Sequence, residues 1–215
     1  LLPPDQFISL AEESGAILPL GRWVLQQACR QIRTWQARHA SAPRLTVAVN
    51  VSVRQLQHPG FPQEVREALE DSGLDPGDLI LEITESVMMQ DVETAIARLC
   101  ELKSLGVQLA IDDFGTGYSS LSYLQQFPLD ILKIDKSFVL TVNQKGDGSD
   151  LTRAIIQIGK TLGLETVAEG IEQIEQLAVL RSLGCDLGQG FYFARPLPPD
   201  QMDGYLASAA RGRRA

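Results

Sequence analysis

The feature that most constrains the fold is a regular alternation of short β-branched runs with amphipathic segments. Six apolar runs are candidate strands, at 45–52, 79–84, 107–112, 131–135, 165–169 and, more weakly, 188–191. Helical spacing of apolar residues predicts helices at 5–15, 20–38, 61–72, 92–105, 119–125, 151–162, 174–183 and 199–209. Glycines in the left-handed C-cap position separate several helices from the next strand: Gly73, Gly106, Gly163 and Gly184. The pattern predicts a repeated β-α unit.

The strand runs are nearly continuous in apolar residues, as in LTVAVNVS and LILEITE. Such runs are typical of a parallel sheet that is buried on both faces. A Rossmann fold is disfavoured because no GxGxxG or Walker sequence is present. A closed (β/α)8 barrel needs eight strands and only about six are found. We therefore predict an α/β protein, a modified TIM (β/α)8 barrel that is N-terminally incomplete in this chain, over residues 1–209, followed by a flexible basic tail at 210–215.

Charge and cysteine content exclude several classes of protein. Lys and Arg total 19 against 27 Asp and Glu, giving a formal charge of −8. A nucleic-acid polymer is therefore not an expected partner, and an anionic ligand would need cations as intermediaries. Three widely spaced cysteines support neither a disulfide framework nor a zinc cluster, and they favour a reducing, cytoplasmic location. No apolar run is long enough for a bilayer, so we expect no membrane contact by this segment.

Polar residues follow or end almost every predicted strand. They are Asn50, Glu82, Glu85, Asp112, Asp113, Lys133, Asp135, Glu169, Glu172 and Gln189. Any one carboxylate could be a cap or a surface residue, but a β/α barrel gathers its strand ends at the active-site face. Oxygen ligands without His or Cys favour Mg²⁺ or Mn²⁺, and adjacent carboxylates suit a two-metal site. His39 and His58 lie outside the strand ends and receive no role.

Lys133 lies inside a predicted strand, on the same face as Asp135 by period-two alternation. It could form a buried ion pair, or it could hold an attacking water or a phosphate. A barrel lyase that uses Lys133 in a Schiff base is a third interpretation, which requires a desolvated lysine free of a carboxylate network.

The DFG triplet at 113–115 is not accompanied by the other kinase motifs, so a kinase is rejected. The continuing GTGYSSLSYL segment is either a gating loop or a tight turn.

Six motifs together resemble one known family. They are NVS at Asn50, LEITES around Glu82, IDDFGTGYSSLSYL from Ile111, LKIDKSF around Lys133, VAEGIE around Glu169 and GCDLGQGFYFARPL from Gly184. Over essentially its whole length the chain resembles the EAL-domain cyclic-di-GMP phosphodiesterases of bacterial second-messenger signalling. The resemblance implies Mg²⁺- or Mn²⁺-dependent hydrolysis of one phosphodiester of cyclic di-GMP, giving linear pGpG. It also implies that Ca²⁺ inhibits.

The resemblance assigns a role to each strand-end residue. Asn50, Glu82, Asp112 and Asp113 match metal ligands, and Lys133 and Glu169 match the residues that orient or deprotonate the attacking water. Asp135 and Gln189 match supporting residues of the same site, and Glu172 matches a residue behind the ligands. Glu85 matches the glutamate that anchors the DDFGTG loop, and this loop with its adjacent helix implies a homodimer interface.

The resemblance also implies features upstream of this sequence. The Glu-Ala-Leu motif of the family, and an Arg that contacts the dinucleotide, would precede the segment that LLPPDQFISLAEESG matches. A sensory or GGDEF-type, diguanylate-cyclase-like domain is expected upstream, where a membrane anchor could also lie. For the chain alone we expect weak or no hydrolysis and poor stability. The alternative function is a non-catalytic module that binds cyclic di-GMP or regulates another domain.

Overall fold

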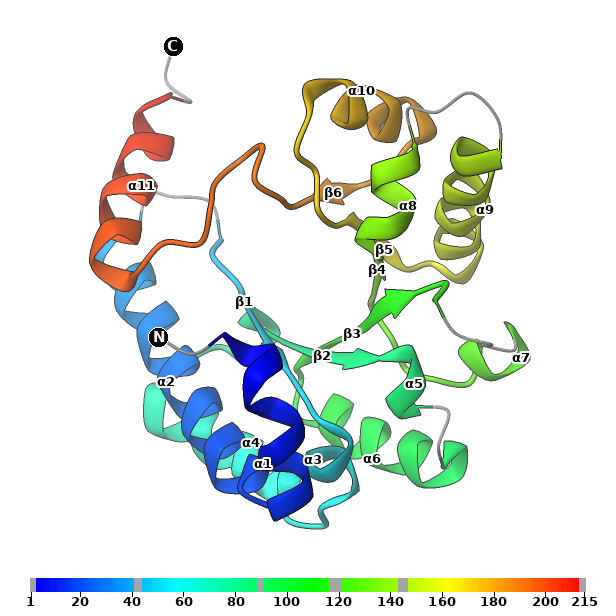
Figure 1. Ribbon diagram of the computed structural model, residues 1–215. Helices are drawn as coiled ribbons and strands as arrows, with labels where there is room; N and C mark the ends of the chain where they lie inside the picture. The colour runs from blue at the N-terminus through cyan, green and yellow to red at the C-terminus, as the bar shows by residue number, and fades with distance from the viewer. Residues whose placement is uncertain (1–2, 41–43, 89–90, 117–120, 143–146, 213–215) are drawn as a thin grey trace. The chain divides into compact units, whose positions relative to one another are not determined.

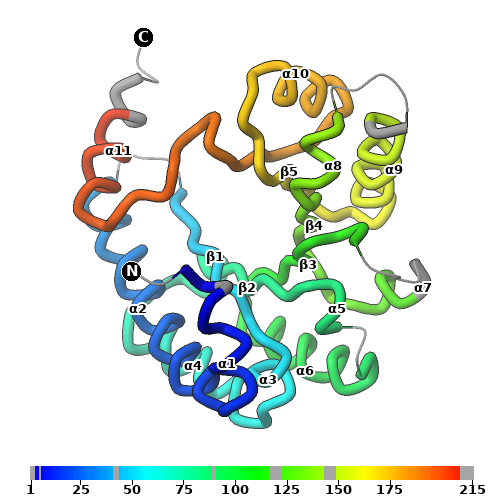
Figure 2. The backbone as a smooth tube through the Cα atoms, in the orientation of Figure 1, coloured from blue at the N-terminus to red at the C-terminus, as the bar shows by residue number. Residues whose placement is uncertain are grey.

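The computed structural model describes residues 3–40, 44–88, 91–116, 121–142 and 147–212. The chain divides into two compact units. Unit 1 comprises Leu1–Glu82, Glu93–Gln108 and Pro198–Ala215, and unit 2 comprises Ile83–Val92 and Leu109–Leu197. Figure 1 labels the elements of both units, and Figure 2 traces the backbone in the same orientation.

Unit 1 is built mainly from helices around a pair of parallel strands. Its elements are η1 (Pro4–Gln6), α1 (Ile8–Ser14), α2 (Ile17–Arg38), β1 (Val47–Asn50), α3 (Val53–Gln57), α4 (Phe61–Ser72), η2 (Pro76–Asp78), most of β2 (Leu79–Thr84), nearly all of α6 (Val92–Ser104) and α11 (Pro199–Gly212). The long helix α2 packs on α4 and on β1. β1 pairs with β2 in parallel, and the register places Asn50 opposite Glu82.

Unit 2 contains four parallel strands and the helices between them. Its elements are the end of β2, α5 (Glu85–Met88), β3 (Gln108–Phe114), α7 (Leu121–Leu124), β4 (Ile131–Ile134), α8 (Lys136–Thr141), α9 (Asp147–Leu162), β5 (Glu165–Ala168), α10 (Ile174–Leu183) and β6 (Leu187–Gly188). The strand order is β3-β4-β5-β6, and every neighbouring pair is parallel. Helix α9 packs against β4 and β5.

The strands of unit 2 carry the apolar core that the sequence predicts. Leu109 and Ala110 in β3, and Ile131 and Leu132 in β4, are almost completely buried, although successive residues of a strand point to opposite faces. Burial of both faces is the property expected of parallel strands covered by helices. Burial of both faces therefore accounts for the near-continuous apolar runs, as predicted.

The described residues contain six strands, which confirms the α/β class and the predicted strand count. The predicted left-handed caps are confirmed, because the glycine after each of four helices has a positive φ: Gly73, Gly106, Gly163 and Gly184.

The structure differs from the prediction in its short helices and at the C-terminal end. Three short helices, α3, α5 and α8, were not expected. Helix α11 continues to Gly212, where a flexible tail from residue 210 was predicted. No helix among the described residues combines the length and the apolar character needed to cross a bilayer.

Candidate metal site

The site begins at an irregularity in β3. In a regular strand, Asp112 and Asp113 would point to opposite faces. The pairing of β3 with β4 shifts register between Ile111 and Phe114, where β3 holds one more residue than its partner. Asp113 has φ 53°, the left-handed conformation that Asp tolerates better than most residues. The bulge therefore lets two consecutive aspartates contribute to one cluster, a device common beside active sites.

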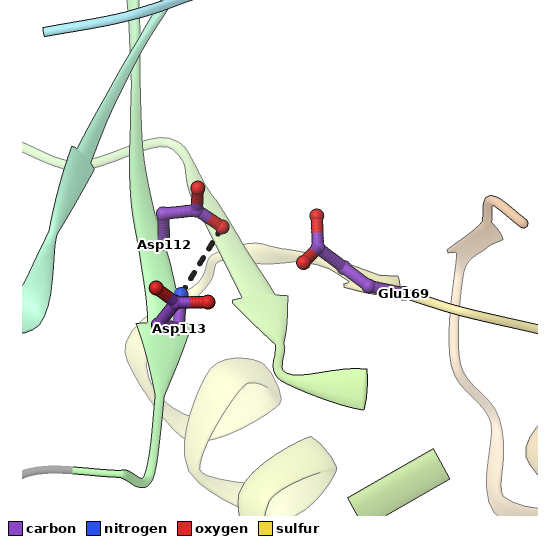
Figure 3. A group of neighbouring side chains, drawn as sticks. All are labelled: Asp112, Asp113 and Glu169. Atoms are coloured by element: carbon purple, nitrogen blue, oxygen red, sulfur yellow. Dashed lines mark hydrogen bonds between the residues drawn. The ribbon is translucent and has the colours of Figure 1, made fainter. Parts of the chain in front are cut away.

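The carboxylates of Asp112, Asp113 and Glu169 converge on one region of unit 2. They come from β3 and from the end of β5, with β4 between them in the sheet, as Figure 3 shows. One oxygen from each lies within 4.8 Å of the others. The amide N–H of Asp113 donates to Asp112 Oδ1 at 3.1 Å, which fixes the Asp112 side chain. These three oxygens could hold a divalent cation, and oxygen donors of this kind suit Mg²⁺ or Mn²⁺.

Lys133 supplies positive charge to this cluster. Its Nζ lies 2.9 Å from Asp112 Oδ1 and 2.6 Å from Glu169 Oε1, and its side chain is only 6% exposed. Gln189 Nε2 donates to the same Glu169 oxygen at 2.6 Å. Glu169 is therefore held from two sides, and Lys133 bridges the carboxylates of two different strands.

The pKa values of two aspartates, Asp113 and Asp135, are shifted in opposite directions. Burial, followed by repulsion from Asp112 and Asp135, raises the pKa of Asp113 above its usual range, although Lys133 opposes the shift. For Asp135, burial also acts to raise the pKa, but hydrogen bonds from Ser137 and Lys136 outweigh it and the net pKa is lowered. Asp135 caps helix α8 by accepting the Ser137 N–H at 2.9 Å. Repulsion from the neighbouring aspartates is the part of the Asp113 shift that a bound cation would offset.

Glu85 anchors the turn after β3. Its side chain is buried, and Oε2 accepts the N–H of Gly115 at 3.0 Å. Gly115 has φ 97°, and a Cβ there would lie 2.8 Å from the Phe138 ring, so the turn requires glycine. The rest of the proposed gating or dimer loop, residues 117–120, lies outside the described residues.

The structure places the other predicted residues as follows. Asn50 and Glu82 stand opposite each other at the ends of the paired strands of unit 1, where Val51 N–H donates to Glu82 O at 2.8 Å. Glu172 is exposed, and its backbone N–H donates to Gln176 Oε1 at 2.8 Å. Ser137 was not singled out from the sequence, although the spacing Asp135–Ser137 at the start of a helix is a capping signal. The chemical roles of all these residues stay predictions.

Comparison with known proteins now gives the family. The EAL domain model matches residues 1–196. MucR of Pseudomonas aeruginosa, a bifunctional diguanylate cyclase/cyclic di-GMP phosphodiesterase, is 44% identical over 98% of this chain, which spans 30% of MucR. The cyclic di-GMP phosphodiesterase NbdA of the same organism is 46% identical over 96% of this chain, which spans 26% of NbdA.

A solved structure agrees with these matches. The MucR phosphodiesterase in complex with c-di-GMP has a TM-score of 0.88 at 44% identity, covering 94% of this chain and 81% of that one. The likeness confirms the predicted α/β class and the incomplete β/α-barrel type of fold. The chain belongs to the EAL domain family. It spans less than a third of the length of the curated relatives it matches here.

Proposed function

We propose that the protein is a cyclic-di-GMP phosphodiesterase, which hydrolyses one phosphodiester bond to give linear pGpG with two Mg²⁺ or Mn²⁺ ions. The observation that carries the proposal is the convergence of Asp112, Asp113 and Glu169 around the buried ammonium of Lys133. Relatives named as cyclic di-GMP phosphodiesterases support the substrate. Two bound divalent cations would lower the pKa of water and neutralise charge that builds up on the phosphate.

Different residues of the chain would have different roles in the reaction. Asp112 and Asp113 would bind cations, and we propose Asn50 and Glu82 as further ligands from the family resemblance. The Glu169 carboxylate would accept the proton of the attacking water, since Lys133 and Gln189 hold its Oε1 in place and fix the orientation of the side chain. Lys133 would also attract the phosphate towards an otherwise acidic surface.

Two other functions were considered. The lyase interpretation requires a lysine free of carboxylates, whereas Lys133 forms ion pairs with Asp112 and Glu169. An ammonium stabilised in this way is a poor nucleophile, so a Schiff base is disfavoured. A non-catalytic module that binds cyclic di-GMP is the second candidate. The MucR structure in complex with c-di-GMP supports cyclic di-GMP as the ligand of either candidate.

Product analysis separates these candidates. The longer protein, with the upstream residues that the family resemblance implies, is incubated with cyclic di-GMP and Mn²⁺ or Mg²⁺, and pGpG is measured by chromatography. Glu169→Gln should lower kcat by roughly 100-fold or more while binding persists, because general-base catalysis contributes about that much. Glu175→Gln, at an exposed position of α10, is the matched control and should act like wild type. Binding by the wild-type protein without any pGpG would favour the non-catalytic module.

The setting of the protein is also proposed. We infer a cytoplasmic enzyme that forms homodimers through the DDFGTG segment and its adjacent helix, with an upstream sensory or GGDEF-type domain in the longer protein. Ca²⁺ should inhibit by occupying the site with a looser coordination geometry than Mg²⁺. Light scattering on the purified protein tests the dimer, and a monomer at micromolar concentration would contradict it.

A further inference from the structure

A buried glutamine follows the cluster residue Glu169 in the chain. Gln176 lies in the first turn of α10 and is only 3% exposed. Glutamine is mostly found on protein surfaces, and a buried amide needs hydrogen-bond partners for both its oxygen and its nitrogen. The partners of Gln176 therefore indicate which parts of unit 2 it holds in place.

The amide oxygen of Gln176 holds the segment 169–173, which begins at Glu169. Gln176 Oε1 accepts the backbone N–H groups of Glu172 and Gln173, at 2.8 and 2.9 Å. Glu172 and Gln173 are exposed, so burial of their side chains does not fix the segment. At its other end, the N–H of Glu169 donates to Ile134 O at the end of β4, at 3.1 Å. The segment is thus held at both ends by hydrogen bonds to its backbone.

The amide nitrogen of Gln176 reaches a different element. Nε2 donates to Val139 O, in the last turn of α8, at 3.3 Å. Helix α8 follows β4, and the segment 169–173 follows β5, which pairs with β4. Lys133 Nζ and Glu169 Oε1 form their 2.6 Å ion pair at the ends of these two strands. One buried amide therefore ties together the two stretches of chain that continue from this ion pair.

A helix cap is the competing explanation for these contacts. Gln173 is the N-cap residue of α10, and Gln176 accepts its N–H from the third helical position, as in a capping box. A cap alone requires neither a bond to the residue before the N-cap nor a bond to another helix. Gln176 makes both, to the N–H of Glu172 and to Val139 O. These two bonds hold the segment rather than the helix.

We propose that Gln176 is a positioning residue, which keeps the Glu169 carboxylate beside Lys133 by fixing the backbone of segment 169–173. The inference rests on the proposed function, in which Glu169 accepts the proton of the attacking water. A general base must lie within hydrogen-bond reach of the proton that it removes, so a displacement of about 1 Å slows the reaction. Loss of the bonds from Gln176 would therefore slow the chemical step and leave substrate binding largely intact.

The test compares three variants of the longer protein, with the upstream residues that the family resemblance implies. Gln176→Met keeps the length of the side chain and removes both hydrogen-bonding groups. Gln176→Glu keeps the acceptor for the two N–H groups and loses only the donor to α8. Thr152→Val is the matched control, because Thr152 is fully buried and its hydroxyl donates to Phe138 O, also in α8, at 3.3 Å.

Three quantities are measured for each variant. Steady-state kinetics with cyclic di-GMP at saturating Mn²⁺ give kcat and KM. Thermal melting reports whether the variant is folded. Hydrogen exchange follows the backbone N–H groups of segment 169–173, which open more often once the bonds from Gln176 are lost.

We expect Gln176→Met to lower kcat by roughly 10- to 100-fold with little change in KM, and to speed hydrogen exchange in the segment. Gln176→Glu should recover most of the lost kcat, because its carboxylate still accepts both N–H groups. Thr152→Val should melt at a lower temperature and keep the wild-type kcat, since it loosens α8 without releasing the segment. If Gln176→Met does not fold, Gln176→Asn takes its place with the same expected result, because its shorter side chain cannot reach the same groups.

The outcomes separate this inference from the phosphodiesterase proposal. A wild-type kcat in folded Gln176→Met would overturn the positioning role and leave the phosphodiesterase proposal intact. Equal losses of kcat in Gln176→Met and Thr152→Val would show that Gln176 acts only through stability, and would also overturn the role. A raised KM at unchanged kcat would overturn it as well, because the segment would then contact the substrate. A wild-type protein that releases no pGpG would overturn both proposals.

Discussion

Replacement of Lys133 by Met tests whether the ammonium neutralises the carboxylate cluster. Methionine keeps most of the side-chain length and removes the charge, so Asp112 and Glu169 lose a partner at 2.9 and 2.6 Å. Removal of one partner of a buried ion pair costs about 3–5 kcal/mol. The two carboxylate side chains remain 12% and 16% exposed, so water offsets part of the loss and we expect about 3 kcal/mol at pH 7.5. Urea unfolding in EDTA measures the difference.

Metal gives this prediction its specificity. Mn²⁺ should stabilise the variant more than wild type, because the cation replaces the missing charge on the same oxygens. The exposed Lys160→Met on α9 should change stability by less than about 1 kcal/mol. Equal stability of Lys133→Met and wild type in EDTA, or a deficit that Mn²⁺ leaves unchanged, refutes the reasoning.

Three further changes test the surroundings of the cluster. Hydrogen bonds from Thr166 are the chief cause of the lowered pKa of Asp186, so the ionised side chain stabilises the fold at pH values above its unfolded pKa. Asp186→Asn should therefore lower the free energy of unfolding by about 1 kcal/mol at pH 7, measured by urea unfolding. The difference from wild type should vanish as pH falls through the folded pKa. Gly115→Ala should lose about 1–3 kcal/mol in the same assay, from positive φ and the clash with Phe138, and unchanged stability would contradict the turn geometry. Glu85→Ala should weaken Mn²⁺ binding by roughly 10-fold or more in calorimetry, because it releases the turn after the aspartates, and wild-type affinity would contradict that role.

The sequence predicted the elements of this fold better than the geometry of its site. Long apolar runs and C-cap glycines located the strands and most helices, because burial and positive φ restrict which residues are tolerated. The strand β3 was expected to end at Asp112, but it continues to Phe114 through a bulge. Alternation along a regular strand would have separated Asp112 from Asp113. The bulge depends on pairing with β4, a tertiary contact that no local pattern contains.

The short helices were missed for a related reason. α8 has six residues and α5 has four, too few for a helical period to appear in the sequence. α8 is begun by its Asp135 cap, and the terminal residue of α5 is buried Met88. Lys133 illustrates the converse case. Alternation predicted only that Lys133 shares a face with Asp135, whereas the folded chain shows that its partners are Asp112 in β3 and Glu169 directly after β5.

The charge balance of the cluster connects the fold to the proposed chemistry. Three ionised carboxylates against one ammonium leave a charge of −2, the arithmetic being −3 from Asp112, Asp113 and Glu169 and +1 from Lys133. The pKa of Asp113 is raised first by burial and then by repulsion from Asp112 and Asp135. A divalent cation bound to these oxygens would neutralise the remaining charge. Lys133 is therefore not a substitute for the metal, because it neutralises only part of the charge that the bulge in β3 brings together.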